Sequence, residues 1–213
     1  MTDTNAWNNI PLDDYESHMK QPNVGQAQLL NVLTKKYLQK HSPEHILFLG
    51  ISGGNGLEHI SQKDVKRIFA IDVNQSYLEE THRRYGNKLK QLQLVNADIN
   101  TTEDYFIKAN LIWGALILEY VDVDQCFRFL NKNTAPNAVA IFTIQSNNGV
   151  QSISQTRIES LNAIEHLFQI VNADELQHKA LSYGFELQSR EENMLPNGKS
   201  FITFEFVKHD TIA

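Results

Sequence analysis

Four of the ten glycines in this chain of 213 residues lie within one seven-residue segment, residues 50–56. Glycine adopts left-handed backbone angles at little steric cost, and its missing side chain lets a ligand approach the backbone closely. The segment follows a short apolar run, residues 46–49, which has the length and composition of a buried strand. Ligands of α/β proteins bind just beyond the carboxyl ends of such strands. The glycine cluster therefore predicts a loop that lies against a bound ligand.

Two carboxylates extend this pattern to the next strands. Asp72 ends a second apolar run, residues 67–71, and Asp98 follows a third, residues 92–95. A carboxylate at the end of the strand after a glycine loop can accept hydrogen bonds from the hydroxyl groups of a ribose. The loop and Asp72 together therefore predict a nucleoside site at one edge of a sheet.

The elements that must position these residues alternate between strands and helices along the chain. The apolar runs predict strands over residues 46–49, 67–71, 92–95, 110–116 and 138–144. Helical periodicity or capping residues predict three helices, over residues 74–90, 122–133 and 172–183. Residues 57–62 predict the start of another helix. Such alternation is typical of a doubly wound, parallel α/β sheet.

Further elements flank this alternating region. Residues 12–41 predict two helices divided by Pro22 and Gly25, whereas residues 1–10 are expected to be irregular. Residues 185–191 and 200–207 alternate around a Pro-Asn-Gly turn and predict an antiparallel hairpin. We therefore expect one domain over 1–213, divided into a helical cap (1–43), a cofactor-binding core (44–145), and a variable helix with the terminal hairpin (146–213).

The composition argues against several classes of partner. The formal net charge is −6, whereas non-specific binding to nucleic acid or anionic membrane needs a basic surface. The longest apolar run, residues 111–118, is far shorter than the ~20 residues of a membrane-spanning helix. The single cysteine fits a reducing compartment, and the first residues show no secretory signal. We expect a cytoplasmic protein with no nucleic-acid or membrane partner; its oligomeric state is not predicted.

The same segments resemble four motifs of the class I S-adenosylmethionine-dependent methyltransferases. Residues 45–56 are similar to the glycine-loop motif, and residues 68–73 to the motif whose acid holds the cofactor ribose. Residues 95–99 are similar to the motif whose acid meets the adenine amino group, and residues 110–120 to the motif that lines the methyl-donor pocket. The resemblance implies a Rossmann-like, mostly parallel sheet of seven strands with an antiparallel C-terminal hairpin. It also implies S-adenosylmethionine as cofactor and S-adenosylhomocysteine as product.

The resemblance further implies which residues bind the cofactor. They are Tyr15, Gly50, Ile51, Ser52, Gly54, Asn55, Asp72, Val73, Asp98, Ile99 and Leu116. Two positions depart from the family pattern: Phe48 stands where members usually carry an acid, and Ser52 where they usually carry glycine. The acid normally helps to hold the amino end of the cofactor, a role that the Ser52 hydroxyl or a backbone carbonyl could take over.

Methyl transfer from a sulfonium requires mainly alignment, and a base only where the acceptor must lose a proton. Glu119 and Tyr120 follow the fourth predicted strand at the ligand-facing edge, and His18 lies in the helix before the core. We expect the catalytic residues among these three, acting on a small-molecule acceptor. Tyr15 would cover the sulfonium with its ring, and residues 145–147 would bind a polar substrate.

Two other classes of protein remain open. The spacing Gly50-x-x-x-Gly54-x-Gly56 also occurs in NAD(P)-dependent short-chain oxidoreductases, but their Tyr-x-x-x-Lys pair is missing from this sequence. A non-catalytic nucleoside-binding protein of the same fold would retain the predicted site. No metal is expected, because the histidines and the single cysteine lack metal-ligand spacing. The basic residues of segment 82–90 are expected to face solvent on a helix.

Overall fold

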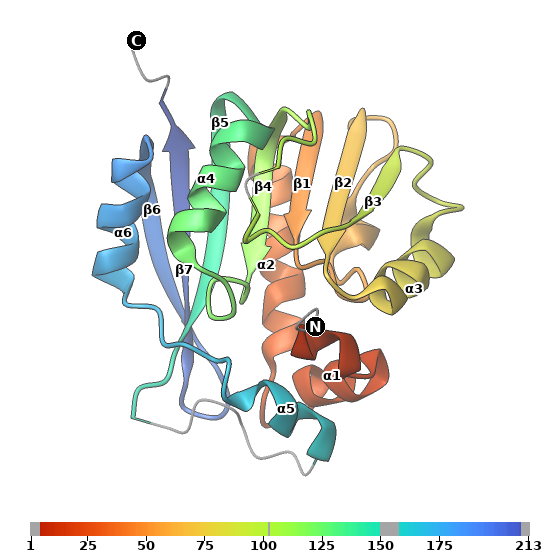
Figure 1. The fold of residues 1–213 in the computed structure, drawn as a ribbon, viewed down its shortest axis with the longest axis vertical. Helices are drawn as coiled ribbons and strands as arrows, with labels where there is room; N and C mark the ends of the chain where they lie inside the picture. Colours follow the sequence, from red (N-terminus) through yellow and green to blue (C-terminus); the bar gives the residue numbers. More distant parts are fainter. Residues whose placement is uncertain (1–4, 102, 150–157, 210–213) are drawn as a thin grey trace.

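The computed structural model describes residues 5–101, 103–149 and 158–209. Its seven strands form one sheet in the order β3-β2-β1-β4-β5-β7-β6 (Figure 1). The strands are β1 (His45–Leu49), β2 (Arg67–Asp72), β3 (Leu92–Asn96), β4 (Ala109–Ala115), β5 (Thr134–Ser146), β6 (Phe185–Met194) and β7 (Ser200–Lys208). The described pairs are parallel except those of β7, which runs antiparallel to both of its neighbours, β5 and β6. The predicted fold class and the terminal hairpin are therefore confirmed.

The helices occupy both faces of this sheet and one of its edges. They are η1 (Ala6–Asn9), α1 (Leu12–Lys20), α2 (Gln26–His41), η2 (Leu57–His59), α3 (Gln75–Tyr85), α4 (Val123–Asn133), η3 (Glu159–Leu161), α5 (Asn162–Glu165) and α6 (Ala173–Ser182). Helices α3, α4 and α6 begin at side chains that accept backbone N–H groups, namely Asn74, Asp122 and Asn172. None of the described helices is long and apolar enough to cross a membrane.

Two apolar clusters lie on opposite faces of the sheet, since neighbouring residues of a strand point to opposite faces. Leu47 and Leu49 of β1 pack with Phe127 of α4, whereas Phe48 packs with Leu33 of α2. Helices α4 and α6 accordingly lie in front of the sheet in Figure 1 and α2 behind it. Both faces of the central strands are covered, which explains their continuous apolar sequences.

Two expectations about the elements are wrong. The helix expected to start over residues 57–62 is only the short 3-10 turn η2, and the long helix α2 packs against that face of the sheet. The first ten residues, expected to be irregular, contain the 3-10 helix η1, which Asn5 caps by accepting the N–H of Trp7 at 3.1 Å. Part of the segment before the hairpin in which the variable helix was expected, residues 150–157, lies outside the described residues.

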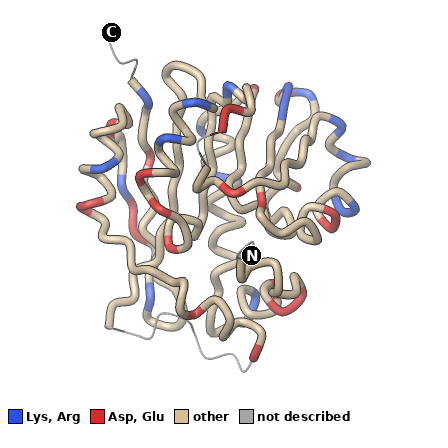
Figure 2. Tube along the Cα trace, viewed as in Figure 1, with Lys and Arg blue, Asp and Glu red and all other residues tan. Residues whose placement is uncertain are grey.

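Only the first part of the predicted helical cap (1–43) lies below the carboxyl ends of the parallel strands, where Figure 1 places α1, α5 and the first described residues; its second helix, α2, packs on a face of the sheet instead. Acidic residues mark α1 in Figure 2, and Asp13 and Asp14 occupy its first turn. Carboxylates at that position stabilise the helix through its dipole. The carboxyl ends of the parallel strands are therefore covered by α1.

Candidate functional site

Three cavities meet under α1 at the carboxyl edge of the sheet, and the ring of Tyr15 lines all three. We name them after one residue of each: the Asp72 cavity, the Arg84 cavity and the His18 cavity. Gly50 and Ser52 line both the Asp72 and Arg84 cavities, and Leu116 lines both the Asp72 and His18 cavities. Shared walls make the three cavities parts of one branched site with Tyr15 at the branch point.

The Asp72 cavity brings together most of the predicted cofactor residues. Its lining includes Tyr15, Gly50, Ser52, Asp72, Val73, Asp98, Ile99 and Leu116. Besides Asn5 and Ser52, the walls are apolar or aromatic, with one carboxylate at the end of β2 and one just after β3. Apolar walls with a few polar groups suit a nucleoside, whose base is flat and whose ribose carries hydroxyl groups.

Asp72 is held in place by the two loops beside it. One carboxylate oxygen accepts the N–H of Ser52 at 2.9 Å, and the other accepts the N–H of Asn74 at 2.9 Å. Burial raises the pKa of this carboxyl, although the backbone N–H groups of Asn74 and Ser52 oppose the shift. Because each carboxylate oxygen has two lone pairs, both oxygens retain the capacity to accept a hydroxyl group.

Asp98 has a similar local arrangement at the end of β3. Its Oδ1 accepts the N–H of Asn100 at 2.9 Å, and Ile99 between them is buried. This hydrogen bond fixes the direction of the Asp98 carboxylate. Asp98 lines the same cavity as Asp72. The structure thus places the two predicted acids on one cavity.

The other predicted loop residues lie around the Arg84 cavity, which has a volume of about 270 Å³. Ile51 and Asn55 line this cavity, whereas Gly54 lines none of the three and shapes the turn, with a φ of +84°. Ser52 has a φ of +49°, the left-handed region in which glycine is favoured. The family's usual glycine at this place is thus explained by backbone conformation, which Ser52 adopts at a cost of about 1 kcal/mol.

Phe48 also contributes to the wall of the Arg84 cavity and is buried in the apolar cluster under α2. An acid at this position would lose its hydration among apolar side chains. Phe48 therefore suits a position that α2 covers with apolar side chains.

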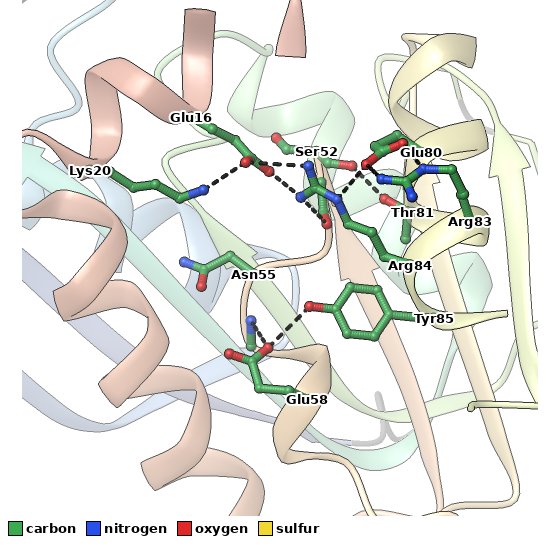
Figure 3. Close-up of polar contacts among 12 residues, drawn as sticks. Glu16, Lys20, Ser52, Asn55, Glu58, Glu80, Thr81, Arg83, Arg84 and Tyr85 are labelled. Carbon is green, nitrogen blue, oxygen red and sulfur yellow. Dashed lines mark hydrogen bonds and ion pairs between the residues drawn. The ribbon is translucent and has the colours of Figure 1, made fainter. Parts of the chain in front are cut away.

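Arg84 ties the cap to the glycine loop (Figure 3). Its guanidinium donates to the carboxylates of Glu16 in α1 and Glu80 in α3, and to the Gly53 carbonyl at 3.1 Å. Lys20 donates to Glu16 at 2.7 Å. We call these groups the Arg84 clamp. The expectation that this basic segment faces solvent is wrong for Arg84, although Arg83 is exposed and pairs with Glu80.

Tyr15 is the centre of an aromatic cluster over the site. Trp7 of η1 meets the rings of Tyr15 and Tyr120 edge-on, with centroids 5.6 and 4.9 Å apart, and Tyr77 stacks on Tyr15 at 6.5 Å. Burial raises the pKa of Tyr15 to about 12, although a hydrogen bond with Ser52 opposes the shift. Tyr15 is therefore neutral and presents aromatic surface to the branch point.

The His18 cavity is smaller, about 40 Å³, and lies on the other side of Tyr15. Its polar lining residues are His18, Gln26, Gln145 and Lys199, besides Tyr15 and Tyr120. Burial, with a contribution from the charge of Lys199, lowers the pKa of His18 to about 4. At neutral pH the imidazole is therefore uncharged and has one nitrogen that can accept a proton.

Glu119 lies just behind this cavity but does not line any of the three. Its Oε1 accepts the N–H of Gln145 at 2.7 Å, while Oε2 has no hydrogen-bond partner among the described residues. Burial raises the pKa of this carboxyl to about 7. Glu119 therefore joins the ends of β4 and β5 and positions Gln145.

Comparisons with known proteins identify the fold. No known protein-family profile and no curated protein match the sequence. Among solved structures, the N-methyltransferase NodS from Bradyrhizobium japonicum WM9, in complex with S-adenosyl-L-homocysteine, has a TM-score of 0.64 at 16% identity, with 93% of each chain covered. The geranyl diphosphate C-methyltransferase from Streptomyces coelicolor A3(2), in complex with Mg²⁺, geranyl diphosphate and S-adenosyl-L-homocysteine, has a TM-score of 0.68 at 11% identity, with 95% of this chain and 94% of that chain covered. The chain has the class I methyltransferase fold.

A further structural match shows that the fold alone does not identify the reaction. The [4+2]-cyclase SpnF matches with a TM-score of 0.67 at 12% identity, covering 85% of this chain and 82% of that chain. One fold can thus support different reactions, so function must be argued from the site residues.

Several residues of the site were not predicted from the sequence, and three of them are prominent. Trp7, Arg84 and Lys199 line or close the cavities, yet none belongs to a family motif that the sequence shows. The only local signal is the tryptophan in an otherwise polar N-terminal segment, since a large apolar ring favours burial.

Proposed function

We propose that this protein transfers a methyl group from S-adenosylmethionine to a small-molecule acceptor. The observation that carries the proposal is the branched site. A cavity with apolar walls and two strand-end carboxylates, a cavity along the glycine loop and a third cavity with a neutral histidine all meet at Tyr15. These three chemistries match a nucleoside, an amino-acid tail and an acceptor. The methyltransferase structures with bound S-adenosylhomocysteine support the same assignment.

The residues around the Asp72 cavity fit the nucleoside part of the cofactor. Asp72 would accept the ribose hydroxyl groups, and Asp98 would accept the adenine amino group. Val73, Ile99 and Leu116 supply apolar walls, since all three line the cavity. The amino-acid part of the cofactor would follow the glycine loop, where Ile51, Ser52 and Asn55 line the Arg84 cavity.

When bound, S-adenosylmethionine supplies a methyl group on a sulfonium, so that an acceptor lone pair forms the new bond to carbon while the carbon–sulfur electron pair returns to sulfur. The role of the protein is alignment, and Tyr15 presents an aromatic face to the position at which the cavities meet. His18 would take the acceptor's proton where the acceptor has one to lose: its imidazole is uncharged at pH 7, although the lowered pKa of about 4 makes it a weaker base than an ordinary histidine. Tyr120 forms the wall between the nucleoside and acceptor sides.

Glu119 acts through another residue in this proposal. Its carboxylate holds the end of β5 through the Gln145 N–H, and Gln145 lines the His18 cavity. We therefore assign Glu119 as a positioning residue and keep His18 as the proton acceptor.

Isothermal titration of the full chain with S-adenosylhomocysteine, and separately with NAD⁺, tests this proposal. We expect S-adenosylhomocysteine to bind with one site per chain and NAD⁺ to give no saturable heat. A protein that binds NAD⁺ and not S-adenosylhomocysteine would support the oxidoreductase alternative instead. Incubation with methyl-labelled S-adenosylmethionine and pooled small metabolites then separates an enzyme, which transfers label, from a protein that only binds the nucleoside.

A further inference from the structure

Two of the residues described in the structure bring carboxylates to the wall of the Arg84 cavity, Glu16 and Glu58. Glu16 of α1 pairs with both Lys20 and Arg84. Glu58 of η2 stands apart from the Arg84 clamp in Figure 3. Within the described part of the chain, only an imidazole nitrogen, His59 Nε2, lies as close as 4.0 Å to the Glu58 carboxylate. The cavity therefore has one carboxylate that no described lysine or arginine neutralises.

Neutral groups hold Glu58 in the cavity wall. Its Oε1 accepts the side-chain amide of Asn31 at 2.5 Å, and its Oε2 accepts the Gly56 N–H at 3.0 Å and the Tyr85 hydroxyl at 3.3 Å. Burial opposes ionisation, but these hydrogen bonds keep the pKa of Glu58 below its ordinary value, so the carboxylate is charged at neutral pH. Each carboxylate oxygen has two lone pairs, so Oε1 can accept a further donor.

The contacts between the glycine loop and α2 explain why Glu58 reaches the cavity. The Asn55 side chain donates to the Ala27 carbonyl at 2.9 Å and accepts the Asn31 amide at 2.9 Å. The same Asn31 amide donates to Glu58. Helix α2 therefore holds the loop and η2 close to itself, and both Asn55 and Glu58 line the cavity.

Other groups that could receive a cation along the glycine loop already have partners. The Ser52 carbonyl accepts the Thr81 hydroxyl at 2.7 Å, and the Ser52 side chain hydrogen-bonds to Tyr15. The Gly53 carbonyl accepts the guanidinium of the Arg84 clamp at 3.1 Å. The end of β1 contributes the apolar side chain of Phe48. Glu58 is thus the charged acceptor that the cavity offers to a cation.

We infer that Glu58 binds the ammonium group at the amino-acid end of S-adenosylmethionine. The inference rests on the proposed function, which places this end of the cofactor in the Arg84 cavity. The cavity of about 270 Å³ has room for the seven heavy atoms beyond the sulfur, since each water-sized group needs about 10–15 Å³. A hydrogen bond from an ammonium to a carboxylate is roughly twice as strong as one between neutral groups. Glu58 would therefore select a cofactor that carries a free amino group.

Solvent limits the size of the expected effect. The Glu58 side chain is 46% exposed, and ion pairs that remain in contact with water are weakened by screening. We expect the ammonium to raise the affinity about threefold to tenfold.

S-adenosylhomocysteine and its analogue without the α-amino group make a matched pair of probes, because they differ only in the group that Glu58 should bind. Isothermal titration of the full chain with each compound gives two affinities for the unmodified protein, for Glu58→Gln and for Glu103→Gln. Glu103 is the control, since it also accepts a tyrosine hydroxyl, that of Tyr105 at 2.6 Å, but lies outside the three cavities.

The unmodified protein and Glu103→Gln should both bind S-adenosylhomocysteine about threefold to tenfold more tightly than the analogue. Glu58→Gln should lose most of this preference and bind the analogue within twofold of the unmodified protein, because the lost contact is absent from that compound. A folded Glu58→Gln protein that keeps the full preference, or that loses affinity equally for both compounds, would overturn the inference. If Glu58→Gln does not fold, Glu58→Asp decides, since the retained charge should preserve the preference and a lost preference would contradict the assignment.

The unmodified protein separates this inference from the proposed function. If it binds both compounds with equal affinity, the Glu58 assignment fails and the proposed function stands. If it binds neither compound, the proposed function fails, and the inference fails with it.

Discussion

Replacing Asp72 with asparagine removes one negative charge from the proposed ribose site and leaves the shape of the side chain almost unchanged. The carboxylate accepts two backbone N–H groups at 2.9 Å, from Ser52 and Asn74. In Asp72→Asn, one oxygen still accepts, but the new amide group points donor hydrogens at the other N–H. One such lost bond to a charged, buried acceptor lowers the free energy of unfolding by about 1–3 kcal/mol.

The same change should weaken cofactor binding by a comparable amount. A hydrogen bond between a hydroxyl group and a carboxylate contributes about 1.5–3 kcal/mol. Since 1.4 kcal/mol corresponds to a factor of ten, the dissociation constant for S-adenosylhomocysteine should rise roughly tenfold to 150-fold. Isothermal titration measures this change, and urea unfolding measures the stability of the same preparation.

Asp104→Asn is the matched control. Asp104 also accepts the N–H of the residue two positions later, Phe106, at 2.7 Å, but lies outside the three cavities. We expect its affinity for S-adenosylhomocysteine to stay within twofold of the unmodified protein. The comparison separates the general effect of removing an acid from the loss of a group in the site.

An analogue of S-adenosylhomocysteine without the 2′-hydroxyl group tests whether Asp72 acts on the ribose directly. If the contact is direct, removing the hydroxyl should cost much less in Asp72→Asn than in the unmodified protein, because the interaction has already been lost. Additive losses would mean that Asp72 only shapes the glycine loop. Unchanged affinity in a folded Asp72→Asn protein would refute ribose recognition by this residue altogether.

Two further predictions concern the cap and the buried acid. Arg84→Met removes the Arg84 clamp, so the association and dissociation rates of S-adenosylhomocysteine should both rise severalfold in stopped-flow fluorescence of the two tryptophans, Trp7 and Trp113. Lys66→Met, which alters the exposed ion pair with Glu44 outside the three cavities, should leave both rates unchanged. Glu119→Gln should remove a pH dependence of stability. Its folded-state pKa of about 7 lies above the ordinary value of 4.5, so the unmodified protein should lose about 3 kcal/mol of stability as pH rises from about 4.5 through 7. Urea unfolding at pH 5 and pH 8 should show that loss for the unmodified protein and a much smaller one for Glu119→Gln; equal losses would contradict the assignment.

The strands and the nucleoside half of the site could be predicted because their signals are local. The apolar run of β2 ends at Asp72, and the parallel sheet brings that end beside the glycine loop, so one short pattern fixes both the element and the position of its acid. The same holds for Asp98 after β3. Strand ends in a parallel sheet share an edge, which converts positions along the chain into a site.

The residues that close the site depend on contacts between distant segments, which no local pattern reveals. Arg84 has Glu80 one helical turn away, a spacing typical of a solvent-exposed pair, yet it also reaches Glu16 in α1. Lys199 follows a Pro-Asn-Gly turn, a context in which lysine is ordinarily exposed, but the hairpin folds back onto the cap. The missing helix after the glycine loop has a similar cause, since α2 already covers that face of the sheet.

The central claim is that the branched site holds S-adenosylmethionine with its nucleoside between Asp72 and Asp98. A crystal structure of the full chain with S-adenosylhomocysteine tests it most directly. We predict electron density for the ribose hydroxyl groups at the Asp72 carboxylate, with the sulfur beside Tyr15 at the branch point. A nucleoside bound elsewhere, or no density in crystals soaked at saturating concentration, would contradict the account.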